Sequence, residues 1–166
     1  MTMKLTILGS GTAIVTARRG SSGYLIKIAD KTLLLDGGSG TLRKIAEASS
    51  SFKEVDYAIY SHLHPDHVTD LISLLFALRI PSNYKSKDLT VIGPAGMKEF
   101  HRKLTETFDN FIEPRGYELT INELSGGDLD FEDFKLTSSL INHHEGSLAY
   151  RVESKDGKSI VYSGDT

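Results

Sequence analysis

The first third of the chain alternates between short apolar runs and turn residues, a pattern typical of β-strands. Three such runs cover residues 4–11, 22–30 and 31–38, and the last of them closes on Gly37 and Gly38. The spacing and length of the apolar positions predict a strand for each run, because side chains two positions apart lie on the same face of a strand.

The pattern then changes to a helical period. Residues 40–50 place Leu42, Ile45 and Ala46 on one side of a helix. A longer apolar stretch, residues 70–80, predicts a packed helix that stops before the next proline, because the residue before a proline disfavours helical geometry.

Between and after these helices the apolar runs are strand-like again. Residues 54–62 predict a buried strand that leads directly into a group of histidines. Residues 89–108 predict a strand, a Gly-Pro turn and an amphipathic helix. Further strands are predicted at residues 117–124, 134–141, 147–153 and 159–164, with an Asp156-Gly157 hairpin turn joining the last two. The alternation predicts an α/β fold in which residues 1–166 form a single domain.

Composition narrows the class of protein. Of the 166 residues, 39% are hydrophobic and 25% charged, which suits one domain with its own core. The absence of cysteine excludes disulfides, thiolate metal sites and cysteine nucleophiles. The formal net charge of -3 argues against a surface built mainly to hold a nucleic-acid backbone. No segment has the pattern of a signal peptide or the length of a membrane span, so we expect a cytoplasmic protein without membrane contact.

Half of the six histidines lie in one short stretch. His62, His64 and His67 stand with Asp66 directly after a predicted strand. In an extended segment, side chains two positions apart project the same way, and a proline stiffens the turn that follows. Neutral imidazole and carboxylate are the ligands expected for zinc, and also for iron or manganese. The sequence therefore predicts a metal site here, whereas His101, among charged residues of a predicted helix, is expected to be an ordinary exposed histidine.

The same stretch matches a known signature. "HLHPDH", residues 62–67, resembles the His-x-His-x-Asp-His motif of the metallo-β-lactamase superfamily, and the resemblance is closest to its ribonuclease Z-like branch. Five other stretches resemble that branch in the same order along the chain: "LGSGTA", "SSGYLI", "LLLDGG", "HHEGSLAYRVE" and "VYSGDT". The resemblance implies a metallo-β-lactamase αββα sandwich, of which this chain covers roughly the first half to two-thirds.

The resemblance also implies a site for two divalent metal ions, zinc first and manganese or iron as alternatives. The implied ligands are His62, His64 and His143 for one metal, Asp66 and His67 for the other, and Asp165 bridging both. Asp36 is expected behind these ligands, close enough to orient them. In "NHHEG" the motif spacing favours His143 over His144, which we expect to be a polar loop residue.

Such a centre implies hydrolysis. Two divalent metals roughly 3.5–4 Å apart can share a hydroxide that is nucleophilic at neutral pH and can clamp the attacking and leaving oxygens. The resemblance therefore implies a metal-dependent hydrolase, a phosphodiesterase acting on small or short substrates, with Asp66 also placing the nucleophile. Two alternatives stay open: hydrolysis of esters, thioesters or lactones on the same centre, and a metal-binding half that is inactive without a partner.

Three departures from the branch qualify the resemblance. His143 and Asp165 are only 22 positions apart, which leaves no room between them for the substrate-clamping arm of tRNA-processing enzymes, so tRNA is expected to be a poor substrate. Asp70 stands where the branch usually shows glycine. The superfamily's final histidine motif is absent from the sequence, so we expect the domain to be C-terminally incomplete. A homodimer, or a complementing C-terminal segment or chain, is expected to complete it.

Overall fold

The computed structural model describes residues 2–14, 16–81 and 87–166. Its strands are β1 Met3–Gly9, β2 Gly23–Ile28, β3 Lys31–Gly37, β4 Tyr57–Ile59, β5 Leu89–Pro94, β6 Leu119–Leu124, β7 Gly127–Asp130, β8 Phe134–Leu140, β9 Leu148–Ser154 and β10 Ser159–Tyr162. Its helices are α1 Thr41–Glu47, α2 Pro65–Val68, α3 Asp70–Arg79 and α4 Met97–Thr107, with a 3₁₀ turn at Phe52–Glu54. Within the described residues, no helix is long and apolar enough to cross a membrane.

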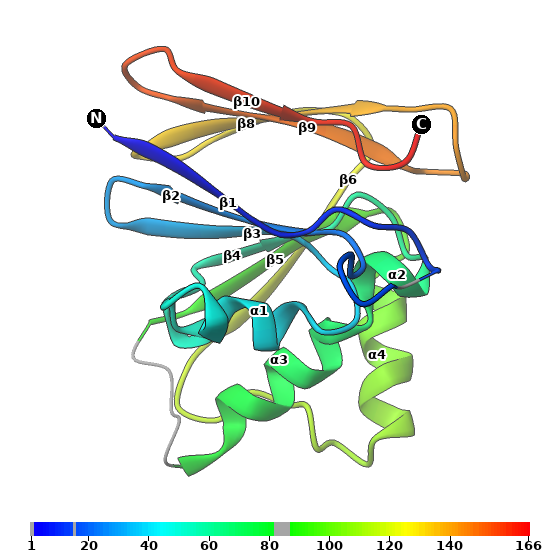
Figure 1. Cartoon of the computed structure of the whole chain (residues 1–166). Helices are drawn as coiled ribbons and strands as arrows, with labels where there is room; N and C mark the ends of the chain where they lie inside the picture. The colour runs from blue at the N-terminus through cyan, green and yellow to red at the C-terminus, as the bar shows by residue number, and fades with distance from the viewer. Residues whose placement is uncertain (1, 15, 82–86) are drawn as a thin grey trace.

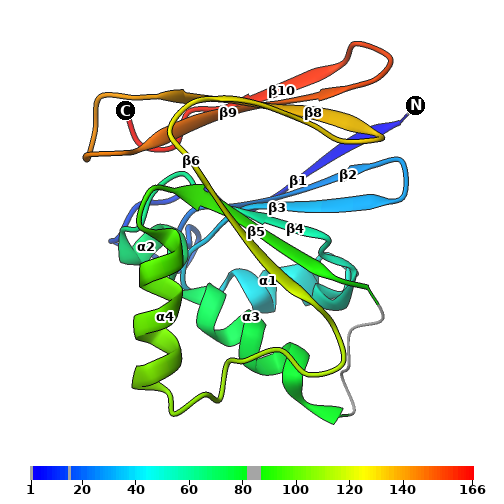
Figure 2. The ribbon, with the colours of Figure 1, turned by 180° about the vertical axis from the view of Figure 1, so that it is seen from behind.

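These elements form three layers. A six-stranded sheet, ordered β1-β2-β3-β4-β5-β6, lies between the helices on one side and a four-stranded sheet, ordered β10-β9-β8-β7, on the other (Figure 1). Seen from behind, α4 runs alongside β5 and β6 and covers the far end of the larger sheet (Figure 2). The described residues therefore make an αββ arrangement, three of the four layers of the predicted sandwich.

The larger sheet is mixed. β1, β2 and β3 pair antiparallel, whereas β3, β4, β5 and β6 pair parallel. Parallel strands bring their carboxyl ends to one edge of the sheet, and ligands of open α/β sheets bind outside that edge. Asp36 lies near the carboxyl end of β3 and His62 follows β4, so both lie at this edge.

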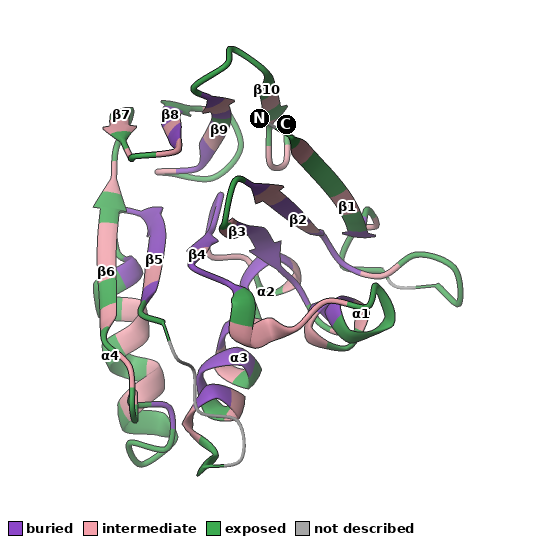
Figure 3. Ribbon diagram, turned by 90° about the vertical axis from the view of Figure 1, so that its left-hand side faces the viewer, coloured by how far each residue is buried: buried purple, intermediate pink, exposed green. Residues whose placement is uncertain are grey.

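Two apolar layers hold the stack together. One lies between the helices and the larger sheet, and the other lies between the two sheets. The central strands β3, β4 and β5 contact both layers, and Figure 3 shows them buried almost throughout. Burial on both faces explains why these strands appear in the sequence as continuous apolar runs rather than as alternating patterns.

The predicted strands differ from the structure in two places. The strand predicted over residues 54–62 is regular only in β4, because the 3₁₀ turn precedes it and the chain bends at Ser61. At that bend the Ser61 N–H donates to Asp36 Oδ1 at 2.7 Å instead of to a strand. β7 was not predicted, since its sequence "GDLD" is short and mostly polar.

The helices follow the predictions more closely. α3 begins at Asp70 as predicted and ends one residue early, at Arg79. α1 is shorter than the predicted 40–50, because Ser49 has a positive φ of 55° that ends the helix. Ile45 is buried as expected, but Ala46 is exposed, so the buried stripe of α1 is narrower than predicted.

His101 is not the ordinary exposed histidine that the sequence predicts. It lies on α4 and is partly buried, and its Nε2 atom has no hydrogen-bond partner among the described residues. The error has a simple cause, since charged neighbours in the sequence do not report which face of a helix a side chain occupies. Burial lowers the pKa of His101, and the charge of Glu113 only partly opposes that effect.

This burial makes stability depend on pH. Because the pKa of His101 is lower in the fold than the unfolded value of about 6.5, the unfolded chain takes up the proton first as pH falls. The free energy of unfolding should therefore decrease below about pH 6.5. Replacing the residue, as His101→Leu, should remove this loss. Urea unfolding of both proteins at pH 7.5 and 5.5 tests it, and an equal difference between the two proteins at both pH values would contradict it.

Candidate metal centre

The histidine stretch lies where the parallel part of the sheet ends. After β4 the backbone stays extended through His64, with φ -67° and ψ 145°, and α2 then begins at Pro65. Proline suits the first helical position because no intrahelical donor is needed there. The His67 N–H donates to the His64 carbonyl at 3.0 Å. This turn places the His67 ring 4.2 Å from the ring of His62, measured between centroids.

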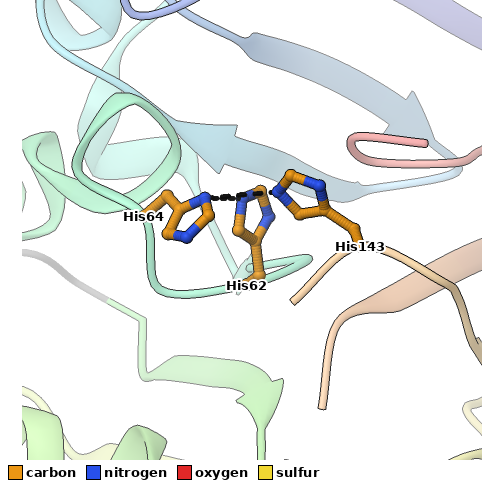
Figure 4. A group of neighbouring side chains, drawn as sticks. All are labelled: His62, His64 and His143. Carbon is orange, nitrogen blue, oxygen red and sulfur yellow. Dashed lines mark hydrogen bonds between the residues drawn. The ribbon is translucent and has the colours of Figure 1, made fainter. Parts of the chain in front are cut away.

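Three histidines drawn from both sheets form a first group. His62 and His64 follow β4 of the larger sheet, and His143 lies in the loop between β8 and β9 of the smaller one. His62 Nε2 lies 3.0 Å from His64 Nδ1, and His143 Nε2 lies 3.2 Å from the same atom (Figure 4). Two nitrogens bound to a tetrahedral zinc at about 2.0–2.1 Å stand about 3.3–3.4 Å apart. The spacing of these nitrogens therefore suits one ion of this size.

Hydrogen bonds hold the smaller sheet against the histidine stretch. The Leu148 N–H donates to the Ser61 carbonyl at 2.9 Å, and the Tyr150 hydroxyl donates to the Tyr60 carbonyl at 3.0 Å. Both join β9 to the segment that follows β4. They explain how His143, far away in the sequence, comes to lie beside the other two histidines.

A second group consists of His62, His67 and Asp165, whose ligand atoms lie within 4.8 Å of one another. His67 Nε2 lies 3.2 Å from Asp165 Oδ1 and 3.6 Å from Asp66 Oδ2. The other oxygen of Asp165 lies 3.9 Å from His143 Nε2. One carboxylate thus reaches toward both groups, and His62 belongs to both. The structure brings all six predicted ligands together, although Asp66 borders the second group rather than belonging to it.

Asp36 is the buried anchor behind these ligands. It is fully buried, and its carboxylate accepts hydrogen bonds from the Ser61 N–H and hydroxyl and from the Tyr162 hydroxyl. His67 Nδ1 lies 2.6 Å from Asp36 Oδ2. Because this bond occupies Nδ1, the ring presents Nε2 to the second group, which is how a carboxylate commonly orients a metal-binding histidine.

Ser61 and Tyr162 are the site residues that sequence reasoning missed. The Ser61 hydroxyl donates to Asp36, so it can accept from His62 Nδ1, which lies 2.9 Å away. That arrangement leaves His62 Nε2 free of a proton and able to bind a metal. Tyr162 stands 126 positions from Asp36, and its hydroxyl also lies 2.8 Å from Ser22 Oγ. Ser61 directly precedes His62 and Tyr162 lies in the "VYSGDT" stretch, but no local pattern indicated that either hydroxyl bonds to Asp36.

Burial and neighbouring charges act on the central histidines in opposite directions. Burial, together with the neighbouring His67, lowers the pKa of His62 to about 4, so His62 is neutral at pH 7. Burial also opposes a charge on His67, but the hydrogen bond and the negative charge of Asp36 outweigh it and raise the pKa of His67. A neutral ring is the form of histidine that binds a metal.

The structure also separates the two neighbouring histidines. His143 directs Nε2 into the first group, while His144 Nδ1 lies 3.2 Å from the carbonyl of Glu145 in its own loop. The His144 ring stands beside His64 at 5.1 Å between centroids, but none of its nitrogens joins either group of described residues. This geometry favours His143, as the motif spacing does.

Comparison with known proteins places the chain in a family. The family model described as Anti-Pycsar protein Apyc1 matches residues 3–166. The chain belongs to this family.

Curated relatives carry a different name. Ribonuclease Z of Archaeoglobus fulgidus is 29% identical over 157 residues, which are 94% of this chain and 49% of that protein. Ribonuclease Z of Nanoarchaeum equitans is 31% identical over 151 residues, 90% of this chain and 46% of that protein. The chain thus spans about half the length of the curated relatives it matches.

Solved structures agree with the predicted fold. Human tRNase Z, short form, superposes with a TM-score of 0.83 at 22% identity, covering 99% of this chain and 69% of that one. The metallo-β-lactamase fold protein YhfI from Bacillus subtilis superposes with a TM-score of 0.80 at 26% identity, covering 99% of this chain and 63% of that one. These structures confirm the metallo-β-lactamase fold, and the curated relatives named ribonuclease Z confirm the resemblance to that branch.

Proposed function

We propose that this chain carries the metal centre of a phosphodiesterase that acts on small or short substrates. The observation that supports the proposal best is that two groups of ligand atoms share His62 and meet at Asp165. A carboxylate whose two oxygens reach toward both groups, as those of Asp165 do, could hold two ions close together, at the spacing of about 3.5–4 Å typical of two-metal hydrolases. Relatives named ribonuclease Z favour a phosphodiester as the bond that is cleaved.

The proposed ligands are those implied by the sequence: His62, His64 and His143 for one ion, Asp66 and His67 for the other, and Asp165 between them. Divalent metal in this centre would lower the pKa of a water molecule, so that the water could lose a proton and attack near neutral pH. Its positive charge would also offset the negative charge of the phosphate. Zinc is preferred because most of the ligands are nitrogens, with manganese and iron as alternatives.

The chain's own side chains prepare the centre. Ser61 and Asp36 each hold the Nδ1 side of a histidine ring, so that His62 and His67 direct Nε2 inward. Asp66, with Oδ2 3.6 Å from His67 Nε2, would both bind metal and orient the attacking water by a hydrogen bond. The side chain of Asp165 is 46% exposed.

Replacing Asp66 with alanine tests this proposal. Hydrolysis of bis-p-nitrophenyl phosphate should fall by ~10²-fold or more, since the variant loses both a ligand and the group that orients the water. A chelator should abolish the wild-type rate, and added zinc should restore it. Asp130→Ala, which removes an exposed carboxylate of β7, should change nothing. A chelated protein that kept its rate would rule out the metal mechanism.

The substrate class needs a panel, because a metal-activated water attacks carbonyl and phosphoryl centres alike. The panel contains a cyclic nucleoside monophosphate, a short oligonucleotide, a precursor tRNA, a thioester and a lactone. We expect the two small phosphodiesters to be cleaved fastest. The relatives named ribonuclease Z do not support the prediction that tRNA is a poor substrate, so efficient cleavage of the precursor would replace our substrate class. Faster cleavage of the lactone or thioester would favour the ester-hydrolase alternative.

A second candidate is a metal-binding half that needs a partner for activity. The side chains of His143 and Asp165 are 28% and 46% exposed, so another chain could reach the centre and complete it. If a homodimer completes the centre, both the specific activity and the molecular mass in solution should fall on dilution. A complementing segment or chain predicts metal binding without hydrolysis by the isolated 166 residues. A cytoplasmic location stays a prediction.

A further inference from the structure

The first turn of α1 is capped by a residue of another helix. The N-cap position is Gly40, with φ 88°, and glycine has no side chain that could accept a hydrogen bond. The Leu42 N–H instead donates to Asp70 Oδ2 at 2.7 Å. Asp70 is the first residue of α3. One carboxylate therefore serves the N-terminal ends of two helices, where backbone donors and helix dipoles favour a negative charge.

The segment held in this way is the one that carries Asp36. Residues 36–42 run from the end of β3 into α1, and Gly38 lies directly against the histidine stretch. A Cβ atom at Gly38 would stand only 1.9 Å from the Asp66 carbonyl oxygen, so the two backbones touch with no space for a side chain. Any movement of residues 36–42 would therefore displace the backbone of the ligand stretch, residues 62–67.

Two ties join these segments. The first is the buried pair of Asp36 and His67, with Oδ2 and Nδ1 2.6 Å apart. The second is the bond from Leu42 to Asp70, three residues beyond His67. Gly38 lies between the two bonded residues of the first segment, Asp36 and Leu42, and its contact residue Asp66 directly precedes His67 on the second. A pair of segments joined at two points resists the sliding and rotation that a single bond would allow.

We propose that Asp70 is a positioning residue of the metal centre. By holding Leu42 it keeps residues 36–42 seated on the ligand stretch, and so fixes the direction in which Asp36 aims His67 Nε2. This role rests on the proposed metal site. It also gives a reason for aspartate at the position where the sequence departs from the glycine usual in the branch it resembles.

Three variants separate this role from simple helix capping. Asp70→Ala removes the acceptor, whereas Asp70→Asn keeps an oxygen that caps a helix about as well as aspartate does. The matched control is Asp56→Ala. Asp56 is also buried, and it accepts a hydrogen bond from the Thr32 N–H at 2.8 Å, but at the opposite end of β3 from the metal centre. Zinc affinity is measured by calorimetric titration, and the Tm is measured separately in the presence of a chelator.

Asp70→Ala should weaken zinc binding by ~10-fold, the lower end of what the loss of an orienting partner costs. Asp70→Asn should recover most of that affinity, and Asp56→Ala should lower the Tm while leaving the affinity unchanged. Unchanged zinc affinity in Asp70→Ala would overturn this inference but not the proposed function. A loss of zinc affinity in Asp70→Asn or in Asp56→Ala equal to that in Asp70→Ala would also overturn it. Wild-type protein that bound no divalent metal would overturn the proposed function, and this inference with it.

Discussion

Replacing His62 with alanine is expected to remove the ion held by the first group. The Nε2 atom of His62 has one lone pair and can bind one ion, which the proposed ligand set places with His64 and His143. The loss of a residue that only orients a ligand costs about 10–100-fold in affinity, and the loss of a ligand itself should therefore cost more than ~100-fold at that ion. Metal content after dialysis, measured by mass spectrometry, and zinc titration by calorimetry give the two readouts.

Neighbouring histidines supply the controls. His64→Ala breaks the same group and should lose the same ion, whereas His67→Ala should keep that ion and lose the other. His144→Ala changes a histidine beside the centre that joins neither group, so it should bind zinc like the wild type. A His62→Ala variant that kept its full metal content would show that these side chains do not hold the ion.

The second large effect is expected at Asp36. Asp36→Ala should lower the free energy of unfolding by ~3–5 kcal/mol, the usual cost of removing one partner from a buried ionic network. The donors of Ser61 and Tyr162 would lose their acceptor, and His67 would lose the carboxylate that raises its pKa. Urea unfolding with a chelator present measures this effect apart from any contribution of bound metal.

Asp36→Asn keeps the size of the side chain and suits the backbone, because Asp36 has a positive φ of 53° that asparagine tolerates better than alanine. It should lose less stability than Asp36→Ala, since one acceptor oxygen remains. Asp30→Ala, which removes an exposed carboxylate, should have no measurable effect. A loss below ~0.5 kcal/mol for Asp36→Ala, as at ordinary surface positions, would mean that the buried hydrogen bonds contribute nothing.

Site residues that lie close together in the sequence could be predicted, and those that lie far apart could not be predicted from local patterns. His62, His64, Asp66 and His67 could be grouped from the sequence because one turn holds them. His143 could be assigned only through the order of motifs, since hydrogen bonds between β9 and the β4 exit bring it close.

No sequence pattern indicated the side chains that bond to residues far away in the sequence. Tyr162 reaches Asp36 from the other sheet, and Asp70 reaches Leu42 from the next helix, so local patterns could not reveal either bond. α1, α3 and α4 were predictable from their helical apolar periods, and the central strands from their continuous apolar runs. β7 was missed because pairing with β8, rather than its own residues, makes it a strand.

The centre is built from two sheets, and this has a consequence for the lifetime of the protein. His62 follows β4 of the larger sheet, while His143 lies between β8 and β9 of the smaller sheet and Asp165 follows β10 of that sheet. An ion bound to all three would act as a cross-link between sheets, and its binding energy would add to the folding energy. Free metal at 1,000 times its Kd would add about 4 kcal/mol. The abundance of such a protein in a cell would then follow the local supply of zinc, because a metal-starved chain opens more often and meets proteases sooner.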